Sequence, residues 1–480
     1  MTIERGRALL REVKDRIGTC RALGFVDVAL RELNREPNEG MLWLQRLPHV
    51  WLLIVKWALA GWRPDDNRLE PTDEDIKFIT QATWDAMGHL VGVEGRPVIF
   101  IRRMALQQIW LQRSFDTSAI PRQFRILGEL MAGAETTECF RQQYGLTPAQ
   151  FAIVMMHMTA DAGDLLDRPA LSALRPGNPR VPEHWVIVRR ILYRTVPQLH
   201  RDFAEMEVRS TLAEVEVCEQ SPLVRTPFLA SRNLGPVCIH PILLFRMLET
   251  VLFDLARAID ARPFMNEFGP AFEDYLAEVL DDLNAQVIRE DELRQRLVGP
   301  GQVVDFAVVS EEALVLIDAK GIEGHYDELY HNLPEELAAR LRTSLLRAVD
   351  QAIATVDRLP ADLQRNDIYF LCVTFKQVVV TDGIALKELT AGTAECAHPR
   401  WKSSVLTPAR MLFPSGFEFE SIVALANTLQ VPISQVVRDV VADNGNPKTR
   451  KLLLEQHVIA RRAPLEAPAV IQGATNRLRQ

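Results

Sequence analysis

The stretch that decides the fold is VVDFAVVSEEALVLIDAKG, residues 303–321, two apolar runs that meet at an acidic centre. Side chains of a strand alternate between its faces, so Asp305 is the charged residue of the first run, and Asp318 and Lys320 share one face of the second. A carboxylate in a buried strand is costly unless it is paired or binds a cation. The stretch therefore predicts two strands that bring charged groups to one site.

A hairpin would place the two aspartates side by side. If Glu311–Glu312 forms the tip, Ser310 pairs with Ala313, and a regular antiparallel ladder sets Asp305 opposite Asp318 with side chains about 5 Å apart. Glu-Glu is not a favoured two-residue turn. A symmetric four-residue loop would preserve this register, whereas a bulge would shift it.

The paired carboxylates indicate a metal site. Two carboxylates this close repel each other unless a cation lies between them. Oxygen ligands suit Mg²⁺ or Mn²⁺, and Lys320 beside the metal would stabilise developing negative charge or orient a water. The pattern predicts metal-assisted hydrolysis of phosphodiesters. The simpler alternative is a strand-end salt bridge between Asp318 and Lys320, which is common.

Outside the hairpin, helices alternate with further strands. We expect a helix from about Glu267 to Leu283, strands at residues 285–290 and 367–375, and one long helix from about Glu335 to Arg358. This is an α/β pattern. In the first of these helices, Glu273 borders the apolar face at helical spacing, so it is the acid expected to point inward. Its alternative role is a boundary carboxylate with a buried stem.

Taken in order, these elements resemble the PD-(D/E)XK nuclease superfamily, the restriction-endonuclease-like fold. GPAFEDY, residues 269–275, resembles the first-helix motif with Glu273 as its acid, and Val304–Asp305 resembles the motif in which proline often precedes the aspartate. Asp318-Ala319-Lys320 is similar to the (D/E)-x-K element, and Gln351 to the glutamine of the following helix. The likeness spans residues 265–375, under a quarter of the chain.

The resemblance implies a mixed sheet flanked by helices and divalent-metal cleavage of nucleic acid. Asp305 and Asp318 would ligate Mg²⁺, for which Mn²⁺ would substitute, together with the carbonyl of Ala319. Glu273 would bind the metal directly or through water, and Lys320 would position or activate the water. We place a nuclease domain at residues 236–480, with its core at about 265–376. Gln351 completes the expected site, and His325 and His331, which follow the Asp-x-Lys strand, are interpreted as loop histidines.

The first part of the chain, residues 1–235, is predicted to be mostly α-helical, with a role in substrate binding, regulation or assembly. Apolar residues recur at spacings of three and four over the expected helices: Arg7–Arg16, Trp43–Ala60, Glu74–Leu90 and Arg122–Ala132. The apolar run Val50–Trp62 is shorter than a membrane span and contains Lys56, so we interpret it as a buried helix. At the other end of the chain, the tail from Ala463 has few core-forming features and is expected to be loosely ordered.

Composition limits the function classes. The 480 residues are 48% hydrophobic and 25% charged, as in typical soluble globular proteins, which excludes general disorder and a disulfide scaffold. The net charge of -8 is not that of a protein coating nucleic acid with its whole surface, although a local basic groove is compatible with it. Six scattered cysteines without a Cys-x-x-Cys pair, and an N-terminus without a signal peptide, indicate a cytoplasmic location.

These observations favour a cytoplasmic Mg²⁺-dependent nuclease. The superfamily acts mostly on DNA, so DNA is favoured over RNA, with roles in genome (antiviral) defence or DNA repair. The expected partner is nucleic acid and not a membrane; a homo-oligomer and a separate regulatory chain both remain open. One alternative is a catalytically silent nuclease-fold scaffold acting through its helical N-terminal domain. Another is a helical partner-binding protein, which exposure of its tryptophans would support: Trp43, Trp51, Trp57 or Trp62.

Overall fold

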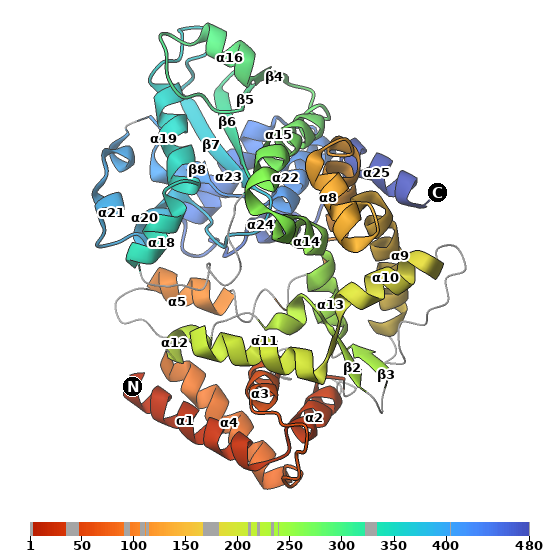
Figure 1. Cartoon of the computed structure of the whole chain (residues 1–480). Coiled ribbons are helices and arrows are strands. Elements are labelled where there is room, and N and C mark those ends of the chain that lie inside the picture. Colours follow the sequence, from red (N-terminus) through yellow and green to blue (C-terminus); the bar gives the residue numbers. More distant parts are fainter. Residues whose placement is uncertain are drawn as a thin grey trace. The chain divides into compact units, whose positions relative to one another are not determined.

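The computed structural model (Figure 1) describes residues 3–34, 48–90, 97–105, 111, 115–166, 182–209, 213–217, 221–231, 235–238, 240–321, 334–403 and 405–479. Two compact units divide these residues. The first comprises the described residues of Met1–Phe115 and Arg141–Leu252, and the second those of Asp116–Phe140, Phe253–His325 and His331–Gln480. The units do not follow a single boundary at residue 235, because Asp116–Phe140 belongs to the second.

The first unit is mainly helical, as predicted. Its helices are α1 (Ile3–Thr19), α2 (Ala22–Asn34), α3 (Pro48–Ala60), α4 (Asp73–Leu90), α5 (Pro97–Met104), α9 (Pro148–Leu166), α10 (Pro182–Leu192), α11 (Val196–Arg209), α12 (Ala213–Glu216), the 3-10 turn η4 (Pro222–Val224) and α13 (Pro241–Leu248). A small sheet was not predicted: β1 (Tyr193–Thr195) pairs parallel to β2 (Phe228–Ser231), and β2 pairs antiparallel to β3 (Gly235–Cys238). Strands this short carry too little alternation to be recognised.

Helix α3 is buried almost throughout, which confirms its prediction as a core helix. Lys56 is buried in this apolar helix, and its charge is paired with the carboxylate of Glu216, 3.6 Å from its Nζ. Trp51 and Trp57 are buried, and the indole of Trp57 donates a hydrogen bond of 2.7 Å to Glu216. Trp62 is half-buried, and Trp43 lies outside the described residues. Among the helices that the structure describes, none has the length and apolar character needed to cross a membrane.

The second unit is built around a five-stranded mixed sheet with the order β4-β5-β6-β7-β8. Strand β5 (Phe306–Val309) pairs antiparallel with β4 (Gln286–Arg289) and with β6 (Ala313–Lys320). Strand β7 (Asp367–Thr374) pairs parallel with β6 and with β8 (Met411–Leu412). A parallel pair needs a crossover connection, and α18 (Pro334–Leu341) and α19 (Leu345–Val356) lie between β6 and β7 in the chain.

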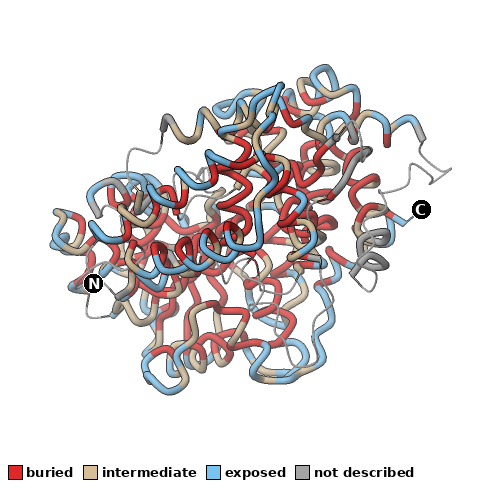
Figure 2. Tube along the Cα trace, turned by 90° about the horizontal axis from the view of Figure 1, so that it is seen from below, coloured by how far each residue is buried: buried red, intermediate tan, exposed pale blue. Residues whose placement is uncertain are grey.

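Helices cover this sheet, and Figure 2 shows along the Cα trace that helices of the chain carry buried and exposed positions in turn. Helices α15 (Ala261–Leu280), α19, α22 (Gly416–Leu429) and α23 (Ile433–Gly445) pack against β6 or β7. Apolar residues make up most of β6 and β7, which are buried almost completely, as expected for central strands covered on both faces. Further helices of the unit are α16 (Glu290–Arg296), α20 (Gly383–Leu389), α21 (Ala394–Ala397), η5 (Pro399–Lys402), η6 (Pro408–Arg410), α24 (Leu454–Ala460) and α25 (Ala469–Arg479).

Three sequence predictions about this unit were wrong. The expected long helix is divided into α18 and α19, because Ser344 turns the chain back on α18: its N–H (3.3 Å) and its hydroxyl (3.5 Å) both donate to the carbonyl of Leu341. Helix α15 begins at Ala261 instead of Glu267, with the side chain of Asp260 capping its N-terminus. The C-terminal tail is ordered: α25 buries a stripe at helical spacing, made of Ile471, Ala474 and Leu478.

The segment Asp116–Phe140 packs within the second unit. It contains α7 (Ala119–Gln123), the π-helix η3 (Phe124–Leu130) and the start of α8 (Glu135–Tyr144). Its side chains and backbone bind acidic residues of α15. Arg125 Nε donates to Glu278 over 2.8 Å, and the carboxylate of Glu267 accepts the backbone N–H groups of Glu135 (2.9 Å) and Thr136 (3.1 Å). Helix α14 (Val251–Ile259) leads from the first unit into the second.

Candidate active site

The hairpin of β5 and β6 turns at Glu311–Glu312, as predicted. The Ser310 N–H donates to the carbonyl of Ala313 over 3.0 Å. The Ser310 hydroxyl donates to the same carbonyl (2.8 Å) and lies 3.2 Å from the Ala313 N–H, which donates to it. This serine thus supplies the local hydrogen bonds that close a turn whose own sequence does not favour it.

The register of this hairpin, also predicted, brings Asp305 and Asp318 together. Phe306 pairs with Ile317, so Asp305, one residue before β5, lies opposite Asp318. Oδ2 of Asp305 accepts a hydrogen bond of 2.6 Å from the N–H of Ala319. The carboxylate of Asp305 is therefore held against β6, beside that of Asp318.

Asp318 and Lys320 form an ion pair at the end of β6. The Lys320 Nζ lies 2.6 Å from Oδ2 of Asp318, which is fully buried. Burial, and then the charge of Asp305, raise the pKa of Asp318 to about 8, although Lys320 opposes this shift. Burial alone would lower the pKa of Lys320, but Asp318 outweighs it and the pKa is raised. One ammonium group thus faces two adjacent acids.

Glu273 on α15 is the third acid of the group. It is half-buried, whereas its neighbour Asp274 is exposed, as the helical periodicity predicts. Burial, followed by the negative charge of Asp305, raises the pKa of Glu273 to about 7, and Lys320 acts in the opposite direction. Glu273 also contributes to the raised pKa of Asp318, so the three acids and Lys320 form one electrostatic group.

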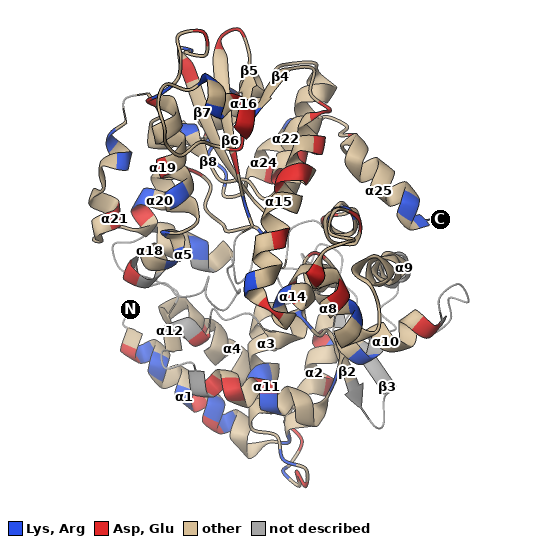
Figure 3. Ribbon diagram, turned by 45° about the horizontal axis from the view of Figure 1, so that its top comes forward, with Lys and Arg blue, Asp and Glu red and all other residues tan. Residues whose placement is uncertain are grey.

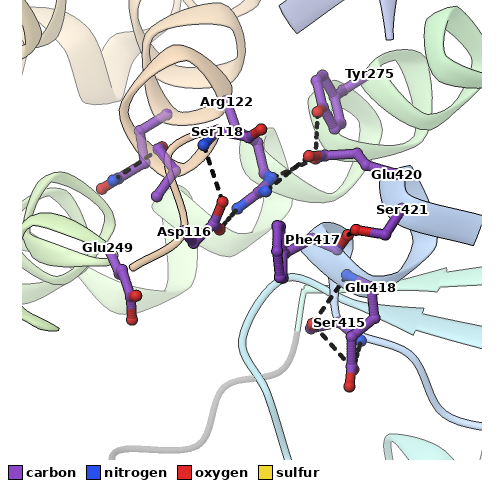
Figure 4. A network of polar contacts seen from close by, with 12 residues as sticks. Asp116, Ser118, Arg122, Glu249, Tyr275, Ser415, Phe417, Glu418, Glu420 and Ser421 are labelled. Carbon is purple, nitrogen blue, oxygen red and sulfur yellow. Dashed lines mark hydrogen bonds and ion pairs between the residues drawn. The ribbon is translucent and has the colours of Figure 1, made fainter. Parts of the chain in front are cut away.

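A buried ion network fixes the helix that carries Glu273 (Figure 4). The guanidinium of Arg122 binds the carboxylate of Glu420 through Nε (2.5 Å) and Nη2 (2.8 Å), and that of Asp116 through Nη1 (2.9 Å). Tyr275 of α15 donates its hydroxyl to Glu420 over 2.5 Å. The segment from 116 onwards, α22 and α15 are therefore joined inside the second unit.

Sequence analysis missed a further acid, Glu290. Arg289, the last residue of β4, pairs with Phe306, so Glu290 follows on the strand next to Asp305. Burial raises the pKa of Asp305, and the charge of Glu290 adds to this effect. Figure 3 marks acidic positions on α15 and α16, the helix that Glu290 begins. The signal was an acid at the end of the expected strand AQVIRE, but its relevance depends on β4 pairing with β5.

Gln351 contacts the backbone just before Asp305. Its Nε2 donates a hydrogen bond of 3.4 Å to the carbonyl of Val303, two residues before that aspartate. Its role in the structure is thus to hold backbone, and no contact places it on the carboxylates. The histidines His325 and His331 lie outside the described residues.

The donor atoms fit a hard divalent cation. Within the described ranges, no three His, Cys, Asp and Glu side chains gather closely enough to form a metal cluster on their own. Mg²⁺, however, is commonly bound through one or two carboxylates, with waters and substrate phosphates as its other ligands. Among the described residues, neither Oδ1 of Asp318 nor Oε1 of Gln351 has a hydrogen-bond partner, although both are buried. The unpartnered oxygen of Asp318, beside the carboxylate of Asp305, is chemically suited to a cation.

Comparison with known proteins leaves the family open. The chain matches no protein-family model, and it has no significant match among curated proteins or solved structures. What the site does must therefore be inferred from its geometry and chemistry.

Proposed function

We propose that this protein is a divalent-metal-dependent nuclease with Asp305, Asp318, Lys320 and Glu273 at its active site. One observation carries the proposal: the hairpin register sets two carboxylates side by side, and Lys320 lies on the fully buried one. A purely structural salt bridge needs one acid. A second carboxylate beside it adds repulsion and desolvation cost, which apolar residues in the same strands would avoid. Perturbed acids that cluster in this way are typical of functional sites.

The roles follow from the chemistry of each group. Asp305 and Asp318 would hold Mg²⁺, and Mn²⁺ would substitute for it. The bound ion would supply Lewis-acid stabilisation of the charge that develops on the phosphate. Lys320 places a positive charge at the same point, and Glu273, whose pKa is about 7, is suited to exchange a proton with water near neutral pH. The N–H of Ala319 fixes the orientation of Asp305.

The substrate that we propose is DNA, with genome defence or DNA repair as the setting. Support for DNA comes from the resemblance of the motifs, whereas the geometry supports phosphodiester hydrolysis more generally. The net charge of -8 implies that contacts with the substrate backbone are local. A cytoplasmic location belongs to the same proposal.

A second candidate is a nuclease-fold scaffold without catalysis. It is favoured by one observation, namely that no third acid completes a metal cluster with Asp305 and Asp318 in the part of the chain that the structure describes. In that case Lys320 would permanently replace the metal as the counter-charge of Asp318. The two candidates differ in whether Mg²⁺ binds at this site.

Cleavage of supercoiled plasmid and of single-stranded DNA, with Mg²⁺, Mn²⁺ or EDTA, tests the proposal. Wild type is compared with Lys320→Ala and with Lys448→Ala, which removes an exposed lysine elsewhere in the second unit. We expect metal-dependent cutting that Lys320→Ala abolishes and Lys448→Ala retains. Full cutting by Lys320→Ala would exclude the site assignment. A wild type that neither cuts nor gains thermal stability from Mg²⁺ would favour the scaffold.

A further inference from the structure

Residues 297–304, which directly precede Asp305, form neither helix nor strand. Val303 and Val304 are nevertheless buried, so their backbone groups need hydrogen-bond partners inside the protein. Helix α19 and the residues just after it supply those partners. Three side chains are involved, and their spacing of four and three places them on one face of the helix: Gln351, Thr355 and Arg358.

Thr355 is the central contact. It is fully buried, and its Oγ1 accepts a hydrogen bond of 3.3 Å from the N–H of Val304, the residue before Asp305. The same hydroxyl donates over 2.8 Å to the carbonyl of Gln351, one turn earlier in the helix. The donor bond orients the hydroxyl so that its lone pairs face Val304. A hydroxyl is the smallest group that can make both bonds at once.

Arg358 holds the earlier part of the stretch. Its Nη1 donates to the carbonyl of Gly299 over 3.2 Å, its Nη2 donates to the carbonyl of Gln302, and its own carbonyl accepts the N–H of Val298 over 3.0 Å. A Cβ at Gly301 would lie 2.9 Å from the guanidinium carbon. The guanidinium therefore packs directly against backbone, which explains a glycine at this position.

We infer that Thr355 and Arg358 are positioning residues for Asp305. They fix the backbone just before this aspartate, while the N–H of Ala319 fixes its carboxylate from the other side. Loss of either contact would let Asp305 move relative to Asp318 and weaken the pair as a cation site. The inference rests on the proposed function, because it assigns the consequence to metal binding. Neither residue belongs to a motif of the sequence analysis.

The test compares Thr355→Val with Thr355→Ser. Valine keeps the shape but removes the hydroxyl, and serine restores the hydroxyl. Thr390→Val is the matched control, since Thr390 is also fully buried and its hydroxyl donates to a helix carbonyl, that of Lys387, over 3.0 Å. Binding of Mg²⁺ is measured by calorimetry and by the Mg²⁺-dependent shift in melting temperature. Hydrogen exchange of the Val304 amide is measured without metal.

We expect Thr355→Val to raise the half-saturating Mg²⁺ concentration about tenfold or more, as is usual when a group orienting a metal ligand is lost. The Val304 amide should exchange faster in this variant, while Thr355→Ser and Thr390→Val behave like wild type. Arg358→Met, at a half-buried position, should weaken Mg²⁺ binding in the same direction even if Thr355→Val fails to fold. Wild-type Mg²⁺ affinity in both Thr355→Val and Arg358→Met would overturn the inference. A wild type that binds no Mg²⁺ would instead overturn the proposed function.

Discussion

Tyr275 and Arg122 donate hydrogen bonds to the same oxygen, Oε1 of Glu420, each over 2.5 Å. Burial raises the pKa of Glu420, and Arg122 opposes that shift. The tyrosine hydroxyl thus supplies one of the donors that keep a buried carboxylate solvated by protein. Because Tyr275 lies two residues after Glu273 in α15, the same bond fixes the rotation of the helix that bears the acid.

Tyr275→Phe should therefore destabilise the protein. Loss of a hydrogen bond to a buried charged acceptor costs about 1.5–3 kcal/mol, which denaturant unfolding would measure. Tyr369→Phe is the comparison, since Tyr369 is also buried but its hydroxyl bonds to the half-buried Arg438 instead of to a buried carboxylate. Equal stability losses in the two variants would contradict a special role for the Glu420 network.

Asp318→Asn should separate stability from function. Below its pKa of about 8, Asp318 is largely protonated, so the amide replaces a neutral acid of the same shape, and we expect the metal-free variant to melt near the wild-type temperature at pH 7. It should gain no stability from Mg²⁺ and should cleave no DNA. Asp274→Asn, at an exposed position next to Glu273, is the control. A wild-type Mg²⁺ response in Asp318→Asn would exclude this aspartate as a ligand.

Stability without metal should fall as the pH rises. The folded-state pKa of Asp318, about 8, lies above its unfolded value of about 4, so the folded state holds an extra proton. That contribution is complete at low pH and is lost as the pH rises through 8. Melting temperatures in EDTA should decrease from pH 6.5 to 9, and Asp318→Asn should flatten the curve. Measurement stays above pH 6.5 because burial lowers the pKa of His49 to about 4, and that group adds the opposite slope at lower pH.

Affinity for Mg²⁺ should rise over the same interval. The metal competes with the proton of Asp318 and with that of Glu273, whose pKa is about 7. We expect the half-saturating Mg²⁺ concentration to be lower at pH 8.5 than at pH 6.5, as measured by calorimetry. Affinity independent of pH would show that Mg²⁺ binds elsewhere.

The fragment 236–480 should not fold to the structure of the second unit. It lacks Asp116–Phe140, so Glu420 and Glu278 lose their arginine partners. A buried carboxylate without its partner costs about 3–5 kcal/mol, a large share of the stability of an ordinary domain. Circular dichroism and hydrogen exchange of the fragment would test this. Cooperative unfolding with native protection of α15 and α22 would contradict it.

Local features of the site were predictable from sequence. The hairpin register follows from alternation and from a turn closed by its neighbouring serine, Ser310, and the inward direction of Glu273 follows from helical spacing. The helical first part and the α/β pattern of the second follow from the same periodicities, whereas the mixed sheet was expected from the resemblance of the motifs. These features depend on residues close together in the chain.

Non-local features could not be predicted. Glu290 lies beside Asp305 only because β4 pairs with β5. Arg125 binds Glu278, a glutamate 153 positions away in the chain. The sequence around Thr355 gives no sign that its hydroxyl accepts a hydrogen bond from the N–H of Val304, 51 positions earlier. Order in α25 likewise depends on elements that pack on its short apolar stripe. A periodic pattern states that a face is buried but does not identify what covers it.

The pairing of Arg122 with Glu420 has a consequence for biosynthesis. The two residues are 298 positions apart, so a ribosome adding 5–20 residues per second needs about 15–60 s to pass from one to the other. Until Glu420 is made, Asp116 is the acid of this network that is available to Arg122. The ion network of the second unit therefore cannot be completed before Glu420 has been synthesised. Chains that terminate before Glu420 lack the acid that joins Arg122 to Tyr275, so the helix that carries Glu273 loses this anchor.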